Sequence, residues 1–115
     1  MNYQGSCHCG QVVFEVEGDL TQAFECNCSH CSRKGYLLWF VPRQQLTLRT
    51  PESDLSTYTF NKHVITHHFC SKCGSAPFGF GKDRSGAATA AVNVRCLEGV
   101  DPAALKKVPV DGRSF

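Results

Sequence analysis

The chain has 115 residues and a formal net charge of +2; 42% of its residues are hydrophobic and 19% are charged. This composition excludes a mainly disordered chain, and the length predicts a single domain over residues 1–115. The basic residues are scattered, with no run longer than two, so no nucleic-acid partner is expected. The basic pair at 106–107 is interpreted as solvated surface.

The N-terminal residues and the cysteine content indicate the compartment. The first residues lack the basic and apolar regions of a signal peptide, and no apolar run approaches the roughly 20 residues that span a bilayer. We therefore expect a cytoplasmic protein with no membrane partner. In a reducing compartment, eight cysteines indicate metal binding or catalysis rather than disulfides.

Short runs of β-branched, aromatic and alternating apolar residues predict a mainly β fold. In chain order we expect strands at 11–17, 23–27, 36–41, 46–48, 55–60, 63–69, 78–80 and 88–94, with a turn at Asn61 and Lys62. Asp101 as N-cap and Pro102 at the first helical position predict one short C-terminal helix at 101–105. Sheets this short and glycine-rich are expected to need a cross-link, which a metal can supply.

Two pairs of cysteines show the pattern of a zinc knuckle, in which a glycine follows the second cysteine at once. The pairs are Cys7 with Cys9 and Cys70 with Cys73, and the glycines are Gly10 and Gly74. Such a glycine can adopt φ > 0, so the chain can turn tightly and aim backbone N–H groups at the sulfurs. The four thiolates would form the closed tetrahedral set of a structural zinc. The alternative is a set of reduced, buried cysteines.

A third cluster, CNCSHC, contains Cys26, Cys28 and Cys31 and has no trailing glycine. Three protein ligands leave a fourth position for water or substrate, which is the pattern of a catalytic zinc. These cysteines are therefore the candidate catalytic residues and the ligands of a second, open zinc. The site would instead be closed and structural if a further side chain completed the tetrahedron. The candidates for that role are His8, His30, His67, His68 and Cys96.

An open zinc with three thiolates has a clear chemical use. It would bind an incoming thiol as thiolate, with a lowered pKa, and deliver the sulfur to a carbonyl carbon. Arg33 and Lys34 follow the third cluster directly. They would offset its negative charge or hold a substrate carboxylate; the alternative is a solvated turn.

The histidines near the cysteines differ in their expected roles. His67 and His68 point to opposite faces of a predicted strand, so at most one of them faces the metal. His8 is expected to point outward. His30 lies inside the third cluster and is the best histidine candidate for proton transfer or for a fourth ligand.

The large aromatic residues are assigned to the core first, because aromatics at strand spacing are more often buried than part of a pocket. They are Trp39, Phe40, Phe78 and Phe80. Cys96 follows a predicted strand and is interpreted as a small, buried hydrophobic residue.

Motifs along almost the whole chain resemble those of one family. They are Cys7-His8-Cys9-Gly10, CNCSHC followed by Arg33, Phe69-Cys70-Ser71-Lys72-Cys73-Gly74-Ser75, Val92-Asn93-Val94-Arg95-Cys96-Leu97 and Asp111-Gly112-Arg113-Ser114. With seven cysteines in matching order and spacing, the chain resembles the glutathione-dependent formaldehyde-activating enzyme family, which also includes the centromere protein V group.

The resemblance implies a β-tent of packed antiparallel sheets with two Zn²⁺ per chain. The structural zinc would bind the four knuckle cysteines, and the second zinc would bind the third cluster. In the enzyme that names the family, glutathione engages the second site and its thiol adds to formaldehyde, which gives S-hydroxymethylglutathione. The corresponding enzyme class is a carbon–sulfur lyase.

Three functions are consistent with these residues. The first is a zinc-dependent lyase or synthase that joins a low-molecular-weight thiol to a small aldehyde. The second is a non-catalytic binding module in which both zincs are structural. The third is thiol redox chemistry at Cys70 and Cys73, which the trailing glycine and the matching first pair disfavour.

Overall fold

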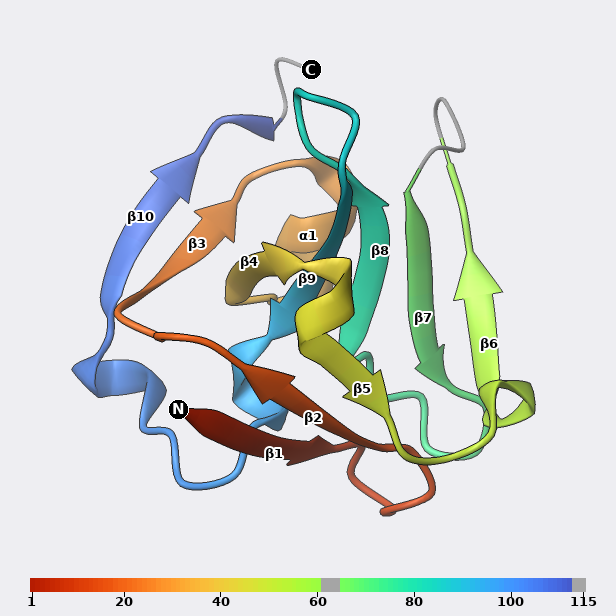
Figure 1. The fold of residues 1–115 in the computed structure, drawn as a ribbon. Helices are drawn as coiled ribbons and strands as arrows, with labels where there is room; N and C mark the ends of the chain where they lie inside the picture. Colours follow the sequence, from red (N-terminus) through yellow and green to blue (C-terminus); the bar gives the residue numbers. More distant parts are fainter. Residues whose placement is uncertain (61–64, 113–115) are drawn as a thin grey trace.

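Over residues 1–60 and 65–112, the computed structural model contains ten β-strands, one α-helix and four short 3₁₀ turns (Figure 1). The strands are β1 (Asn2–Ser6), β2 (Val13–Glu17), β3 (Gln22–Cys26), β4 (Leu38–Pro42), β5 (Leu46–Leu48), β6 (Leu55–Tyr58), β7 (Thr66–Cys70), β8 (Phe78–Lys82), β9 (Ala88–Asn93) and β10 (Lys106–Val110). The helix is α1 (Ser29–Lys34), and the turns are η1 (Arg43–Gln45), η2 (Glu52–Asp54), η3 (Val94–Cys96) and η4 (Pro102–Ala104). The prediction of a mainly β fold is confirmed.

The strands form two sheets. The smaller sheet has the order β1-β2-β5, and the larger has the order β10-β3-β4-β9-β8-β7-β6. Among the strand pairs of the described residues, β10 with β3 is parallel, over five residue pairs, and the others are antiparallel. The larger sheet is therefore mixed, which corrects the expectation of antiparallel sheets.

The main core lies between the two sheets. Phe14 of β2 is fully buried and meets Phe78 of β8 edge-on, with ring centroids 5.2 Å apart. Tyr3 of β1 meets Trp39 of β4 in the same way at 5.5 Å. Each such contact adds roughly 0.5–1.5 kcal/mol beyond the area that it buries. These contacts fix the small sheet, and the loop between β1 and β2, against the large sheet.

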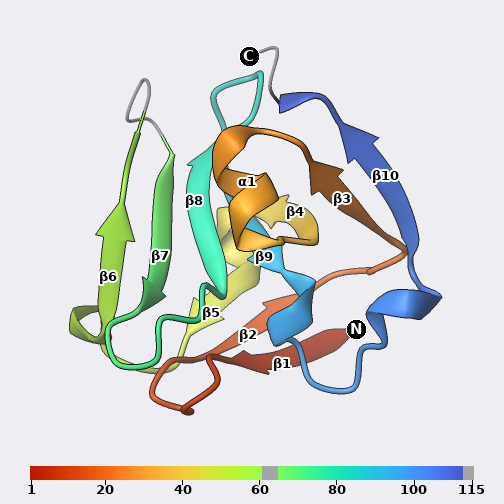
Figure 2. The ribbon, with the colours of Figure 1, turned by 180° about the vertical axis from the view of Figure 1, so that it is seen from behind.

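The helix α1 covers a second and smaller core. Figure 2 shows α1 in front of β4 and β9, between β3 and β8. Cys31 of α1 is buried there with Tyr36, Leu38 and Ala76. The short helix is therefore fixed to the large sheet by one of the cysteines of the third cluster.

The predicted C-terminal helix is wrong. The Asp101 carboxylate does cap a turn, accepting the Ala103 N–H at 3.0 Å, but only the three residues of η4 come after it. The chain then forms β10, which pairs in parallel with β3. A helix over these residues would lose this pairing of the β10 backbone with the backbone of β3. The basic pair at 106–107 belongs to this strand, with Lys106 exposed and Lys107 half-buried.

The eight predicted strands are present, the one at 46–48 with the predicted bounds and the others with shifted ends, and the sequence pattern missed β1, β10 and α1. Trp39 and Phe78 lie in the core, as predicted, and Phe80 is half-buried against it. Phe40 is 48% exposed, so its assignment to the core is wrong. The turn at 61–62, the start of the strand expected at 63–69 and the last residues of the closing motif lie outside the described residues.

Candidate metal centres and adjoining cavities

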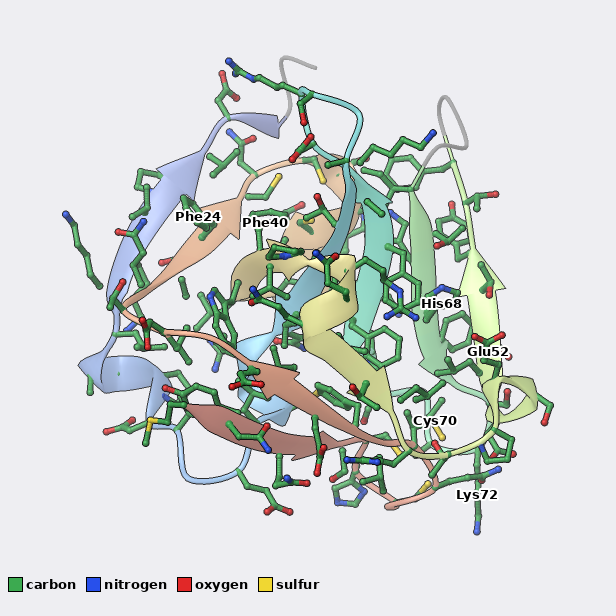
Figure 3. The ribbon with its side chains drawn as sticks, viewed as in Figure 1. Phe24, Phe40, Glu52, His68, Cys70 and Lys72 are labelled. Atoms are coloured by element: carbon green, nitrogen blue, oxygen red, sulfur yellow. The ribbon has the colours of Figure 1, made fainter. Side chains whose placement is uncertain are left out.

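The four knuckle cysteines lie together although they are far apart in sequence. Cys70, which is labelled in Figure 3, ends β7. Cys7 and Cys9 occupy the loop between β1 and β2, and Cys73 lies in the turn after β7. Their sulfurs all lie within 4.8 Å of one another. This four-cysteine group therefore connects the small sheet to the large one.

The two knuckles turn in the same way. Gly10 has φ 84° and Gly74 has φ 79°, and each donates its N–H to the carbonyl of the first cysteine of its pair, at 3.3 Å and 3.0 Å. Cys7 Sγ accepts the Val12 N–H at 3.3 Å, and Cys70 Sγ accepts two N–H groups of its own turn at 3.4 and 3.5 Å. The predicted glycine conformations, and the N–H groups aimed at sulfur, are confirmed.

Hydrogen bonds favour the thiolate form of two members of this group, Cys73 and Cys7. The side chain and backbone of Ser75 lower the pKa of Cys73 to about 5. Burial works against ionisation of Cys7, but the Val12 N–H and the neighbouring sulfurs outweigh it, so the pKa of Cys7 is lowered. At Cys9 the Gln11 N–H also favours the thiolate, but burial and the neighbouring sulfurs outweigh it and raise the pKa of Cys9 to about 11. Zinc binds thiolates, so the hydrogen bonds to Cys7 and Cys73 favour the ligand form of these two thiols.

The sulfur spacing of the four-cysteine group fits zinc. Sulfurs around a tetrahedral Zn²⁺ with bonds of about 2.3 Å lie about 3.8 Å apart. Cys9 Sγ lies 3.6 Å from Cys7 Sγ and 3.7 Å from Cys70 Sγ. Four thiols at this spacing match a closed, structural zinc site in both donor type and geometry.

Cys26, Cys28 and Cys31 also lie together, where β3 runs into α1. Cys26 ends β3, Cys28 is the N-cap of α1, and Cys31 lies within the helix. Their sulfurs lie within 4.8 Å of one another, and no other candidate ligand atom of residues 1–60 and 65–112 belongs to this group. None of the histidines proposed as a closing ligand belongs to it, nor does Cys96. Three thiols without a fourth protein ligand are what an open zinc site requires.

The local fold presents these three sulfurs. Cys28 Sγ accepts the Cys31 N–H at 3.3 Å, which is the role that Ser or Asn usually has at a helix N-cap. Gly35, with φ 70°, ends the helix and donates its N–H to the Cys31 carbonyl at 2.9 Å. Burial opposes ionisation of Cys28, but hydrogen bonds from the Cys31 and His30 N–H groups and from the neighbouring sulfurs together outweigh it and lower the pKa of Cys28. Burial raises the pKa of Cys31. A cation bound here would favour the thiolate form of both.

The C-terminal segment packs directly on this three-cysteine group. A Cβ atom at Gly112 would lie 2.4 Å from Cys26 Sγ and 3.2 Å from Cys28 Cβ, so a larger residue does not fit. The φ angle of Gly112 lies outside the left-handed region, so the contact with sulfur, and not the backbone, requires glycine. Asn27 Nδ2 donates to Asp111 Oδ1 at 3.0 Å and holds the segment beside the cluster.

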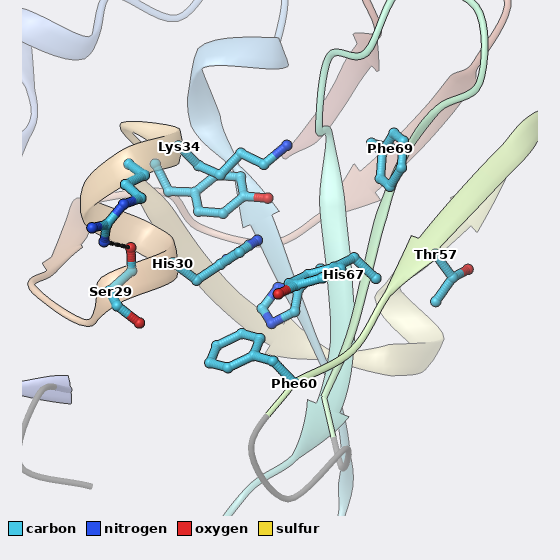
Figure 4. A pocket seen from close by; sticks show the side chains of 10 residues that line it. Ser29, His30, Lys34, Thr57, Phe60, His67 and Phe69 are labelled. Carbon is cyan, nitrogen blue, oxygen red and sulfur yellow. Dashed lines mark hydrogen bonds between the residues drawn. The ribbon is translucent and has the colours of Figure 1, made fainter.

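Two cavities adjoin the three-cysteine group. The first, which we call the thiol cavity, has a volume of about 540 Å³ and contains Cys26, Cys28 and Cys31 in a mainly aromatic and aliphatic wall. The second, the cationic cavity, has a volume of about 750 Å³ and is lined by Arg33 and Lys34 together with aromatic residues (Figure 4). Tyr36, Phe60 and His67 line both cavities. The two spaces therefore share a wall.

His30 and His67 meet at this wall. Their ring centroids lie 4.1 Å apart, and the buried atoms His30 Nδ1 and His67 Nε2 have no hydrogen-bond partner among the described residues. Burial, with nearby cationic groups, lowers the pKa of His67 to about 4, so this ring is neutral at pH 7. His68 lies on the other face of β7, where its Nδ1 is 3.0 Å from Thr57 Oγ1. The prediction that the two adjacent histidines face opposite ways is confirmed.

The remaining candidate residues lie on or near the surface. Arg33 and Lys34 form the last turn of α1 and are exposed, but both line the cationic cavity. Arg33 Nη1 donates to the Ser29 carbonyl at 2.9 Å. His8 is exposed, as predicted. Cys96 is half-buried, and burial raises its pKa to about 11.

Sequence reasoning missed the contact of Gly112 with Cys26 and the shared wall of the two cavities. A signal for the contact exists, because Asp111 and Gly112 begin the closing motif of the chain, to which the pattern alone assigns no role. The wall depends on β6 and β7 lying opposite α1, which no local pattern encodes.

The fold and the two groups define a class: a mainly β protein with one closed and one open set of cysteines suited to a metal. A family model described as glutathione-dependent formaldehyde-activating enzyme matches residues 2–108, and the chain belongs to this family.

Among solved structures, the chain is similar to the crystal structure of a Rhodobacter sphaeroides protein, a Northeast Structural Genomics target. The two are 35% identical, with a TM-score of 0.80, over 95% of this chain and 98% of that one. Within residues 1–60 and 65–112, no helix combines the length and the apolar character needed to cross a membrane.

Proposed function

We propose that the chain is a zinc-dependent carbon–sulfur lyase or synthase that adds a low-molecular-weight thiol, such as glutathione, to an aldehyde such as formaldehyde. The observation that carries this proposal is the open group of three thiols in the wall of a cavity of about 540 Å³. Membership in the glutathione-dependent formaldehyde-activating enzyme family supports it. Each chain would hold two Zn²⁺, one in each cysteine group.

Zn²⁺ held by Cys26, Cys28 and Cys31 would supply one open position at which a thiol is bound as thiolate, with a lowered pKa. The other parts of the reaction fall to the chain itself. Arg33 and Lys34 attract the carboxylates of an anionic thiol into the cationic cavity. The apolar wall of the thiol cavity excludes water from the reacting carbonyl.

His67 is the residue best placed to hold the proton that moves. Its buried Nε2 has no partner among the described residues, and a buried polar atom without a partner calls for a ligand or a role. In the addition a sulfur–carbon bond forms, the carbonyl π bond breaks, and the proton of the thiol ends on the former carbonyl oxygen. A neutral imidazole can carry that proton across the shared wall.

The test is the pair Cys28→Ser and Cys96→Ser. Serine at position 28 keeps an oxygen that can cap α1, so the fold is retained while the thiolate ligand is lost. We expect turnover of glutathione and formaldehyde, followed by NMR exchange, to fall by at least about 1,000-fold. Cys96→Ser, outside both groups, leaves it unchanged. Full activity of Cys28→Ser with every thiol and aldehyde tested would contradict the proposal, as would an inactive parent protein.

A further inference from the structure

The thiol cavity is far larger than formaldehyde requires. Its volume is about 540 Å³. A carbonyl compound with two heavy atoms needs roughly 60 Å³, the space of two water molecules. Cavities of about 300–1,000 Å³ usually enclose ligands of many heavy atoms. Most of this space is therefore available to a part of a substrate other than the reacting group.

The wall around that space is apolar. Phe24 of β3 and Phe40 of β4 line it with ring centroids 5.5 Å apart, and Figure 3 shows them on neighbouring strands. Phe40 is 48% exposed and Ile65 is 49% exposed, and both face this cavity. Large apolar side chains that gather at a cavity next to reactive groups are typical of ligand contact. Among the described residues that line this cavity, Lys82 is the one with a cationic side chain, and it is exposed.

Of the three cationic side chains that line the two cavities within residues 1–60 and 65–112, two belong to the cationic cavity, and the third, Lys82, is exposed. Arg33 and Lys34 line the cationic cavity and do not line the thiol cavity. A thiol that carries carboxylates, as glutathione does, suits the cationic cavity, because its charges would be desolvated without partners against phenylalanine. The apolar space is then left to the carbonyl partner, and the two substrates meet at the shared wall.

We propose that the preferred carbonyl substrate is an aldehyde with an apolar alkyl or aryl substituent of about four to eight carbons. This inference rests on the proposed function and names the substrate class of the same site. The thiol sulfur adds to the aldehyde carbon, the C=O π bond becomes a C–O–H group, and the proton comes from the thiol. The product is a hemithioacetal whose apolar substituent lies against Phe24 and Phe40.

The first experiment compares linear aldehydes from propanal to hexanal with glutathione and the zinc-loaded protein. Their carbonyl groups have nearly equal intrinsic reactivity, so differences report binding of the chain. Burial of each methylene is expected to raise kcat/KM by about 3- to 4-fold. A flat or falling series would overturn the inference. A gain that follows the apolar length of the thiol, at fixed aldehyde, would also overturn it.

A pair of variants locates the effect in the cavity. Ala91 lines the thiol cavity from β9, whereas Ala88, on the same strand, is exposed and outside it. Ala91→Leu fills part of the space, so we expect the increase in kcat/KM from propanal to hexanal to become at least about 5-fold smaller. The kcat/KM for propanal should change least. Ala88→Leu should leave the series unchanged. Equal effects of the two variants would contradict the assignment.

Binding of an apolar chain in the thiol cavity can be measured without turnover. Hexan-1-ol, which cannot react, is titrated into the zinc-loaded protein, with methanol as the control. We expect saturable shifts of the Gly79 and Ala91 amide signals in NMR with hexan-1-ol only. No binding would overturn the inference even if formaldehyde is turned over. If glutathione reacts with no aldehyde at all, the proposed function fails, and the aldehyde assignment fails with it.

Discussion

The two cysteine groups use the same ligand atom and differ in what surrounds it. The four-cysteine group joins the loop between β1 and β2 to the end of β7, so its ligands come from both sheets. The three-cysteine group is local, because its residues lie between the end of β3 and the first turn of α1. The first lines neither of the two cavities, whereas the second lines the thiol cavity.

This difference separates the two tasks of a metal. A closed set that connects distant segments contributes to folding, because its binding free energy is available only when the sheets are in place. An open set on one short helix contributes little cross-linking, but it leaves a coordination position facing a cavity. Loss of a ligand should therefore lower stability in the four-cysteine group and lower activity in the three-cysteine group.

The largest expected effect is on stability. Cys70 is fully buried in the four-cysteine group. Structural zinc in small zinc-binding domains contributes about 10–16 kcal/mol, and Cys70→Ser removes one of the four proposed ligands, so we expect the free energy of unfolding to fall by about 3 kcal/mol. Cys28→Ser should lower it by less than about 1 kcal/mol, because the helix cap is retained. Urea denaturation of both zinc-loaded variants measures this. Equal losses would show that stability does not depend more on the four-cysteine group than on the three-cysteine group.

The four-cysteine group could be predicted from sequence because its signals are local. Each pair carries its own glycine at φ > 0 and its own N–H groups to sulfur. The helix α1 could not be predicted, since it has six residues, no apolar period, and a cysteine in place of a usual N-cap residue. Nor could the sequence predict that the helical segment after Asp101 ends with η4. Asp101 signals a helix start, but the pairing of β10 with β3 makes the following residues a strand.

The second-largest expected effect is on turnover and concerns the two histidines of β7. His67 and His68 are neighbours on β7 that face opposite sides, so each is the control for the other. His67→Asn keeps a polar side chain but cannot carry a proton, and we expect kcat/KM with glutathione and an aldehyde to fall about 100-fold. His68→Asn should reduce it less than about 3-fold. Zinc content, measured in parallel, should not change.

If both histidine variants lost activity equally with zinc retained, the wall between the cavities would have no special role. If His67→Asn lost zinc from the three-cysteine group, His67 would act on the metal site and not on the proton. Either result would remove the assignment of Nε2 as the atom that holds the proton.

The smallest expected effect tests the contact of Gly112 with Cys26, which sequence reasoning missed. Ala at position 112 would bring a Cβ atom to 2.4 Å from Cys26 Sγ, so either the sulfur or the C-terminal segment must move. Neighbours that orient metal ligands typically change affinity by about 10–100-fold when altered, and we expect Gly112→Ala to weaken Co²⁺ binding at the three-cysteine group by about 10-fold. Titration followed by the sulfur-to-cobalt absorption measures this affinity for each group.

Gly81→Ala is the matched control, because its added Cβ would meet only Ile65 Cγ1, at the ordinary contact distance of 3.4 Å. Its Co²⁺ affinities should equal those of the parent at both groups. Gly112→Ala should likewise bind the first Co²⁺, at the four-cysteine group, as tightly as the parent, since Gly112 contacts only the other group. Unchanged affinity at the three-cysteine group would mean that the C-terminal segment is not part of the open site. Weakened binding at both groups would mean that Gly112 supports the fold as a whole, and the separation of a structural and a chemical cluster would then fail at this segment.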